Sequence, residues 1–381
     1  MKQFASFITI CLLLLTAATS VAQNLHPGEI RGVVLSSETG DPLSGAHVFL
    51  SGTKTGTVTE PSGRFHIRNI QPGIYDVVVS MLGYKRETNR HRISPGSSLI
   101  LNHEMKPVVY EMDEIYAGNL DENWQRYFER FEKLFIGESS RADDVMILNP
   151  EVLRFESRWW GRFSAEALAP LQIENRALGY MIIYHLDEFF HIGDQTRWDG
   201  DPLFSELAPA DETEAQLWKQ NRETAFYGSM RHFYLSLIND RLDEEGFMVY
   251  RSPAHSITRP AGTNRMRINR SRLIQSTGDP YLWHLSFSGL LEIIHTESHT
   301  DSNYEEWQRR NHHRDRGSRS SFLELNKPYI TIDSDGEIEE TYGTTRYGYY
   351  SFLRVADNTP RDYRPAEFHL NSGANNKIEE P

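Results

Sequence analysis

The chain has 381 residues, of which 39% are hydrophobic and 24% charged, and its formal net charge is −13 at pH 7. This acidic balance argues against nucleic acid, and against an anionic membrane surface, as a partner. The single cysteine, Cys11, lies inside an N-terminal apolar run. The rest of the chain therefore has no thiol for a disulfide, a nucleophile or a cysteine–zinc site.

Residues 1–22 have the pattern of a secretion signal. Lys2 supplies a positive start, Phe4 to Ala17 form an apolar stretch, and Ser20-Val21-Ala22 has the small residues of a cleavage site. The apolar stretch is shorter than the ~20 residues that a membrane-spanning helix needs. We expect an exported protein that is not membrane-spanning after signal removal. The remaining length is sufficient for two domains of roughly 100–200 residues.

Short β-rich runs alternate with turn signals over residues 29–88. Pro61-Ser62-Gly63 is one such turn signal, and the runs are Ile30–Leu35, Ala46–Leu50, Gly56–Thr59, Arg64–Ile67 and Ile74–Met81. Strands this short, with a turn about every eight to twelve residues, favour a sandwich or barrel over βαβ units. With a last strand at Ser98–Met105, the predicted β-sandwich spans residues 28–107.

The order of these pieces resembles the carboxypeptidase-regulatory-like, or prealbumin-like, domain. The resemblance rests on Gly32-Val33-Val34 in the first strand, and on the segments Gly40 to Val48, Thr59 to Phe65 and Pro72 to Tyr84. That family is an accessory β-sandwich without peptidase chemistry of its own. The resemblance therefore implies that the rest of the chain carries the function.

Residues 108–365 are predicted to form a larger α+β or mainly-β domain with two conspicuous helices. Apolar residues at helical spacing predict one helix over Asp121–Phe135 and a second over Glu214–Asp240. Gly228 falls inside the second helix and indicates close packing or a kink there. Strands are predicted at Ala177–Ile192, Gly246–Arg251, Tyr281–Ser286, Leu290–Thr296, Phe322–Asn326, Tyr329–Asp333 and Glu337–Tyr342. Asp333 to Gly336 reads as a hairpin turn, and we expect the polar tail 366–381 to be disordered.

This second region resembles the uncharacterised segment that follows a regulatory-like sandwich in many exported proteins of certain Gram-negative bacteria. Two blocks carry the resemblance, Pro170 to Tyr180 and Arg222 to Phe233. The resemblance implies a location in the periplasm, at the outer membrane or on the cell surface. It implies no assigned activity.

Hydrolase and nucleotide-binding motifs are absent or poorly placed. His185 and Glu188 have the H-x-x-E spacing of a zinc carboxypeptidase, but residues i and i+3 of a strand face opposite sides of the sheet. The sequence has no G-x-S-x-G elbow, no P-loop and no G-x-G-x-x-G. Asp333, Asp335 and Glu337 are candidate calcium ligands, although a hairpin turn is the better interpretation. We expect no metal and no cofactor, and the catalytic residues, if any, stay unknown.

The candidate ligand-binding residues are the polar side chains of the two blocks: Glu174, Asn175, Arg222, Arg231 and His232. Arg222 and Arg231 are nine residues apart, so at about 100° per residue they point to opposite sides of a helix. One interpretation pairs one of these arginines with Glu174 as a structural ion pair. The other is a carboxylate or sugar pocket with an arginine fork.

Aromatic residues are a further group of candidates, because Trp159-Trp160, Tyr347, Tyr349 and Tyr350 could stack on sugar rings. Adjacent tryptophans on a strand face opposite sides, so at most one of the pair is expected to be exposed. We expect a non-enzymatic binding or assembly protein of the bacterial envelope that recognises an envelope protein, peptide or glycan. The alternative is a periplasmic or surface peptidase or glycosidase with unidentified catalytic carboxylates. A weaker alternative is a partner of an outer-membrane transporter.

Overall fold

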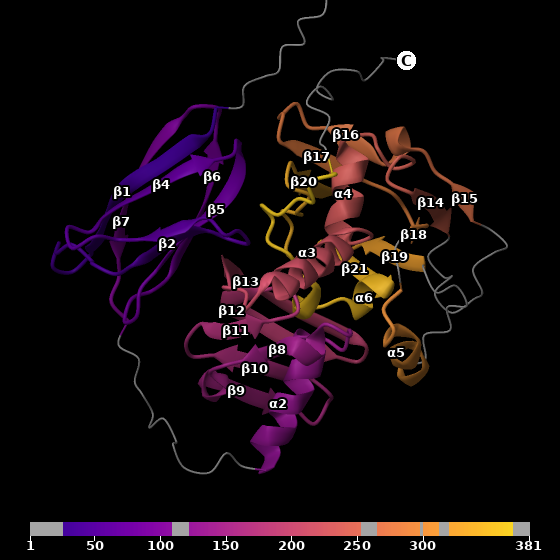
Figure 1. The fold of residues 1–381 in the computed structure, drawn as a ribbon, viewed down its shortest axis with the longest axis horizontal. Coiled ribbons are helices and arrows are strands. Elements are labelled where there is room, and N and C mark those ends of the chain that lie inside the picture. Colours follow the sequence, from indigo (N-terminus) through magenta and orange to yellow (C-terminus); the bar gives the residue numbers. More distant parts are fainter. Residues whose placement is uncertain (1–25, 109–121, 253–264, 298–299, 312–319, 369–381) are drawn as a thin grey trace, which may run out of the picture.

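The structure, a computed structural model, describes residues 26–108, 122–252, 265–297, 300–311 and 320–368 (Figure 1). It is strand-rich, with an N-terminal β-sandwich followed by a larger domain of several sheets and helices. The fold class predicted from the sequence is thus confirmed. The predicted signal segment lies outside the described residues.

The sandwich consists of two sheets whose inner faces share one core. The three-stranded sheet has the order β4-β1-β7, and the four-stranded sheet has the order β3-β2-β5-β6. Its strands are β1 (Gly28–Ser36), β2 (His47–Leu50), β3 (Gly56–Val58), β4 (Arg64–Ile70), β5 (Gly73–Ser80), β6 (Glu87–Ile93) and β7 (Ser98–Met105). Ile30, Val34, Val48, Phe65 and Val77 are among its buried core residues. Alternate residues of β1 face this core, whereas β5 is buried on both faces.

The first sheet of the second domain has six strands. Its longest strand, β12, forms a hairpin with the following strand, β13. β13 pairs along one side of β12, while β10 and β11 pair with successive parts of the other side. The strands are β8 (Val145–Ile147), β9 (Leu153–Ser157), β10 (Phe163–Ala167), β11 (Leu171–Asn175), β12 (Tyr180–Ile192) and β13 (Gln195–Glu206). Helix α2 (Glu122–Phe135), close to the predicted position, covers one face through Phe131 and Phe135.

Two further sheets build the C-terminal half around a separate core. A five-stranded sheet has the order β15-β14-β18-β19-β21, and a three-stranded sheet has the order β16-β17-β20. The strands are β14 (Phe247–Ser252), β15 (Met266–Arg267), β16 (Ile274–Ser276), β17 (Leu282–Leu285), β18 (Leu290–His295), β19 (Ser320–Leu325), β20 (Ile330–Asp333) and β21 (Thr344–Gly348). Short helices are α5 (Tyr304–Arg310), α6 (Tyr349–Phe352), η1 (Ala142–Asp144), η2 (Pro150–Val152), η3 (Arg270–Arg272) and η4 (Val355–Asp357).

The helix predicted over Glu214–Asp240 is two helices, α3 (Glu212–Phe226) and α4 (Met230–Ile238). Gly228 lies between them with a φ of 79°, in the left-handed region that other residues avoid. The Ser229 hydroxyl then caps α4 by accepting from the His232 backbone N–H at 3.1 Å. The glycine therefore marks a break between helices rather than a kink inside one.

Two other expectations about the C-terminal region need correction. The turn Asp333 to Gly336 is present, closed by the Gly336 backbone N–H donating to the Asp333 carbonyl at 3.1 Å. However, the strand predicted at Glu337–Tyr342 is reduced to a single bridge between Ile332 and Ile338. Phe368, inside the predicted tail, is buried in the C-terminal core. Residues 369–381 of that tail lie outside the described residues.

Candidate functional site: the domain junction and an exposed hairpin

Glu174 and Asn175, at the end of β11, have different surroundings. The Glu174 carboxylate lies 3.4 Å from Arg176, rather than from an arginine of the following helices. The Asn175 side chain is fully buried, where it donates to the Ala356 carbonyl at 3.1 Å and accepts from the Leu178 backbone N–H at 2.9 Å. Asn175 thus joins β11 to η4 and shapes the turn before β12.

Arg222, on α3, holds that same turn from the other side. Its guanidinium donates to the carbonyls of Leu178 at 2.6 Å and Gly179 at 3.0 Å, and it lies 4.1 Å from the centroid of the Tyr180 ring. Its carboxylate neighbour is Glu206, at 3.7 Å. Most of this guanidinium is therefore occupied by contacts within the fold.

His232, on α4, is buried among aromatic rings. The backbone N–H of Gly228 donates to its Nδ1 at 3.0 Å, and its Nε2 lies 3.1 Å from the Glu245 carboxylate. Nδ1 is thus an acceptor, and Nε2 carries the proton that is donated to Glu245. Burial lowers the pKa of His232, which favours a neutral ring between Phe226 and Phe247.

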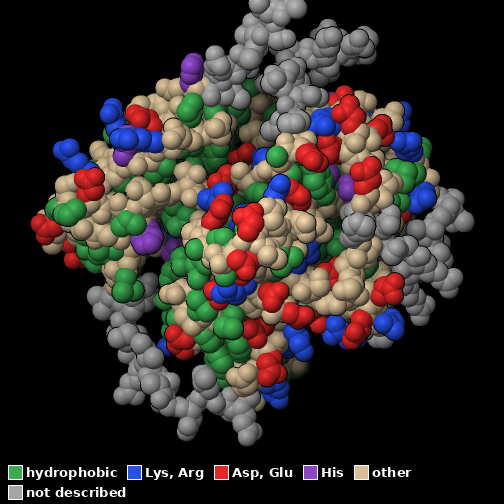
Figure 2. Space-filling model, in the orientation of Figure 1, with side chains coloured by type: hydrophobic (Ala, Val, Ile, Leu, Met, Phe, Trp, Pro, Cys, Tyr) green, Lys and Arg blue, Asp and Glu red, His purple; other side chains and the backbone are tan. Residues whose placement is uncertain are grey.

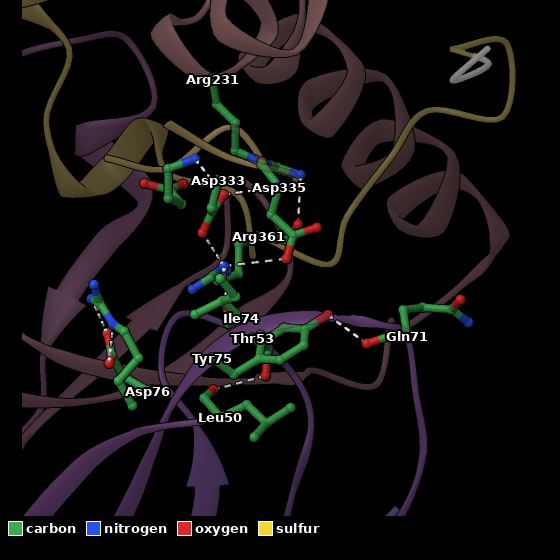
Figure 3. Close-up of polar contacts among 12 residues, drawn as sticks. Leu50, Thr53, Gln71, Ile74, Tyr75, Asp76, Arg231, Asp333, Asp335 and Arg361 are labelled. Carbon is green, nitrogen blue, oxygen red and sulfur yellow. Dashed lines mark hydrogen bonds and ion pairs between the residues drawn. The ribbon is translucent and has the colours of Figure 1, made fainter. Parts of the chain in front are cut away.

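Arg231, the last of the predicted residues, is one of several arginines that meet the turn between β20 and the C-terminal segment (Figure 3). Its guanidinium donates to the carbonyls of Asp335 at 3.2 Å and Arg361 at 2.9 Å, and to the Thr359 hydroxyl at 3.1 Å. The five predicted residues do not converge on one site: they contact different segments of the second domain.

Arg361 is the centre of the junction between the two domains (Figure 3). One of its nitrogens, Nη2, lies 2.5 Å from the Asp333 carboxylate, 3.2 Å from the Asp335 carboxylate and 3.2 Å from the Ile74 carbonyl of the sandwich. Its guanidinium also lies 5.2 Å from the centroid of the Tyr75 ring. Burial raises the pKa of Asp333 and Asp335, and the positive charge of Arg361 opposes that rise.

The loop after β2 is clamped at this junction by main-chain hydrogen bonds. The Gly52 backbone N–H donates to the Pro202 carbonyl at 2.7 Å, and the Phe204 backbone N–H donates to the Thr53 carbonyl at 3.0 Å. On its other side, the Arg361 backbone N–H donates to the Gly52 carbonyl at 2.7 Å. The sandwich loop thus supplies hydrogen-bond partners to the outer edge of β13, which would otherwise be an unpaired sheet edge.

Polar side chains of β6, and of Arg86 just before it, extend the junction. Arg86, Thr88, Arg90 and Arg92 are alternate residues, so they share one face of the strand. That face meets acidic residues of the second domain: Arg86 pairs with Asp187, Thr88 donates to Asp201 at 2.9 Å, Arg90 lies 3.1 Å from Glu339, and Arg92 pairs with Asp279. The alternation is visible in the sequence and could have revealed this contact face.

His185 also belongs to the junction, where it stacks on Phe49 of the sandwich with ring centroids 5.7 Å apart. Burial, with the nearby charge of Arg86, lowers its pKa to about 4. Glu188 instead accepts from the Tyr342 hydroxyl at 2.8 Å. The two residues of the H-x-x-E spacing thus have separate partners, and no cluster of three or more metal-ligating side chains occurs in the described ranges.

The hairpin between β9 and β10 carries both tryptophans of the predicted aromatic pair. It is closed by the Arg158 backbone N–H donating to the Arg162 carbonyl at 2.8 Å. Trp159 is 97% exposed and Trp160 47% exposed, so the expectation that at most one is exposed is wrong. The reason is that both lie in the turn rather than on a strand. Figure 2 shows hydrophobic side chains gathered over β9–β11, near this hairpin.

A family model described as the CarboxypepD_reg-like domain matches residues 30–116. The sandwich is a CarboxypepD_reg-like domain. The TonB-dependent receptor P39 of Formosa agariphila is 28% identical over 110 residues, which are 29% of this chain and 10% of the receptor. The chain thus spans about a tenth of the length of this curated relative.

Three solved structures show limited similarity to the chain. The Bacillus anthracis TIE protein is 24% identical, with 22% of this chain and 17% of that chain covered and a TM-score of 0.20. GBS52, the minor pilin of Streptococcus agalactiae, is 18% identical, with 24% and 48% covered and a TM-score of 0.19. A putative carbohydrate binding protein from Bacteroides uniformis is 9% identical, with 48% and 80% covered and a TM-score of 0.19. At these TM-scores the similarities identify no function.

Within the described ranges, no helix combines the length and the apolar character needed to cross a bilayer.

Proposed function

We propose that this chain is a non-enzymatic binding or assembly protein of the bacterial envelope, which recognises an envelope protein, peptide or glycan. The CarboxypepD_reg-like sandwich and its similarity to a segment of a TonB-dependent receptor support an envelope location. The signal pattern of residues 1–22 supports export.

The observation that carries the proposal is the Arg361 network. Asp333 and Asp335 are the buried acids that most invite a catalytic assignment, and both are paired with Arg361. A glycosidase needs two acids about 5–9.5 Å apart across a substrate cleft, whereas here both carboxylates are buried and bonded to the same arginine. We infer that these charges join the domains rather than perform chemistry.

A docked sandwich also has a consequence for binding. With its loop clamped between β13 and Arg361, the two domains offer a partner one composite surface. The exposed tryptophans of the β9–β10 hairpin are the candidate anchor on it, because tryptophan and arginine are enriched among the residues that dominate binding energy.

The test is photo-crosslinking at that hairpin in cells that export the full chain. A photoreactive phenylalanine analogue replaces Trp159. As the control, the same analogue replaces Tyr329, which is 47% exposed and lies just before β20. We expect position 159, and not position 329, to yield a discrete adduct that mass spectrometry identifies as a protein, peptide or glycan. No adduct at either position would count against the proposal.

A separate experiment tests the proposal that the protein is not an enzyme. Purified full-length protein is incubated with fluorescently labelled peptidoglycan fragments and peptides, and products are followed by chromatography. We expect no product. Cleavage that is lost when one acidic residue is replaced would instead support the hydrolase alternative.

A further inference from the structure

A strip of polar and aromatic side chains begins where β10 leaves the exposed hairpin. The Arg162 guanidinium lies 4.8 Å from the centroid of the Phe190 ring, and the Phe190 and Tyr342 ring centroids are 6.1 Å apart. The Arg197 guanidinium lies 5.2 Å from the centroid of the Tyr342 ring. These four side chains are half-buried, so each is held by its neighbours and still reaches the surface. We call them, with Glu188, the hairpin strip.

Hydrogen-bonding groups follow one another along the hairpin strip. The Glu188 carboxylate accepts from the Tyr342 hydroxyl at 2.8 Å and lies 3.9 Å from Arg162. Arg197 donates to the Thr345 hydroxyl at 3.4 Å. Among the described residues Arg197 has no carboxylate partner, whereas Arg86, Arg92 and Arg361 at the junction each have one. The strip thus presents a carboxylate, a phenol and two guanidinium groups to a ligand.

The backbone of Tyr342 is held in a conformation that its side chain disfavours. Its φ is 58°, in the left-handed region that bulky residues seldom adopt. Such strained positions persist where surrounding contacts fix them, and they cluster at binding and catalytic sites. Here the strain places the Tyr342 ring between Phe190 and Arg197, with its hydroxyl on Glu188.

We propose that the hairpin and the strip bind a glycan, with the tryptophans stacking on pyranose rings and the strip bonding to the hydroxyl groups. This inference rests on the proposed function and names its ligand class. Sugars present apolar ring faces and closely spaced hydroxyls. The indole faces of Trp159 are open to solvent, and a Cβ added at Gly161 would have no neighbour within 4 Å.

A lipid surface fits this region less well, because the strip's carboxylate and guanidinium groups would lose water without gaining partners in an apolar layer. A protein partner is a separate outcome of the test. Acidic and neutral glycans share the same ring and hydroxyl chemistry. They differ at Arg197, whose unpaired charge suits a uronic acid carboxylate.

Calorimetry on the full-length protein tests the inference with two probes, cellohexaose as the neutral sugar and hexagalacturonate as the acidic one. Trp159→Ala and Tyr342→Gly are each expected to weaken binding by about tenfold or more, because each removes a ring from the site. Glycine suits the left-handed conformation at position 342, so the fold is retained. Tyr329→Ala, which removes an exposed ring elsewhere, is expected to leave binding unchanged.

Arg197→Gln distinguishes the two sugar classes. If the ligand is acidic, this variant weakens hexagalacturonate binding and leaves cellohexaose binding unchanged. If the ligand is neutral, cellohexaose binds the wild-type protein and Arg197→Gln has little effect. Either result supports a glycan site.

Two results would overturn the inference. One is that neither hexasaccharide binds at millimolar concentration, and the other is that Tyr342→Gly binds both as the wild-type protein does. If position 159 still yields a discrete protein adduct in cells, the glycan assignment alone is wrong. If it yields none, the proposed function is wrong as well.

Discussion

Arginine and aromatic side chains occur both at the domain junction and around the β9–β10 hairpin, and the two regions use them differently. At the junction, Arg361 lies among Asp333, Asp335 and a sandwich carbonyl, and only a tenth of its side chain is exposed. At the hairpin, Trp159 is almost fully exposed. The first arrangement supplies stability, because its charges are satisfied internally. The second contributes little to the fold and leaves its contact surface for a partner.

Replacing Arg361 by alanine should have the largest effect. It leaves the buried carboxylates of Asp333 and Asp335 without their shared counter-charge, and breaking a buried pair costs about 3–5 kcal/mol. Urea denaturation of the full-length protein measures this loss in the free energy of unfolding. Arg176→Ala is the matched control: the pairs of this exposed arginine with Glu174 and Glu214 should each contribute under about 1 kcal/mol. Equal losses for the two variants would contradict the contrast between a buried junction and an exposed surface.

Acid should weaken the junction through His185. Its pKa is about 4 in the folded protein against an ordinary value of 6.5, because of burial and the facing charges of Arg86 and His47. Below pH 6.5 the unfolded chain takes up this proton and the folded chain does not, so stability falls as the pH drops from about 6.5 towards 4. The full difference is on the order of 3 kcal/mol.

The measurement is the free energy of unfolding at about pH 7 and about pH 4.5, compared between the wild-type protein and His185→Gln. The variant cannot take up the proton, so its stability should fall less over this interval. A slope unchanged by His185→Gln would mean that this histidine is not held neutral at the junction.

One glycine in each region allows the junction and the hairpin to be compared directly, because both glycines have positive φ. Gly52 lies in the clamped loop with φ 76°, and Gly161 lies in the hairpin with φ 97°. A Cβ at Gly52 would lie 3.1 Å from Cδ of Arg361, whereas one at Gly161 would have no neighbour within 4 Å. Both alanine variants incur backbone strain of about 1–2 kcal/mol. Thermal melting should show an additional loss for Gly52→Ala, and equal shifts would indicate that the loop is not clamped.

The sequence allowed the sandwich and helix α2 to be predicted because their side-chain periodicity is local. β13 was not predicted: Gly200 and Pro202 lower its intrinsic strand preference, and it forms because it pairs along β12. Similarly, the apolar spacing across Gly228 predicted one helix, since a periodic pattern does not show where a backbone dihedral changes sign. Long-range pairing and left-handed glycines are the two features that local patterns did not reveal.

The candidate site was harder to predict than the fold. Asn175 and Arg222 are candidates because they are polar side chains within the two blocks that carry the family resemblance. The structure gives these side chains backbone partners within the second domain. Arg361 had no local motif, because its partner Ile74 lies 287 residues away in the chain. The sequence around Asp333 indicates a hairpin turn, with a calcium loop as the alternative, but its counter-charge Arg361 cannot be assigned without the fold.

Trp159→Ala should have the smallest effect on stability, and it provides the sharpest contrast with Arg361→Ala. A side chain that is 97% exposed has almost no burial to lose, so the free energy of unfolding should change by no more than about 0.5 kcal/mol. The same substitution should still weaken binding, because an exposed indole supplies contact area only when a ligand covers it. Urea denaturation and calorimetry on one protein preparation give both values. A large loss of stability without a loss of binding would mean that Trp159 supports the hairpin fold, and the division of roles between junction and hairpin would then be wrong.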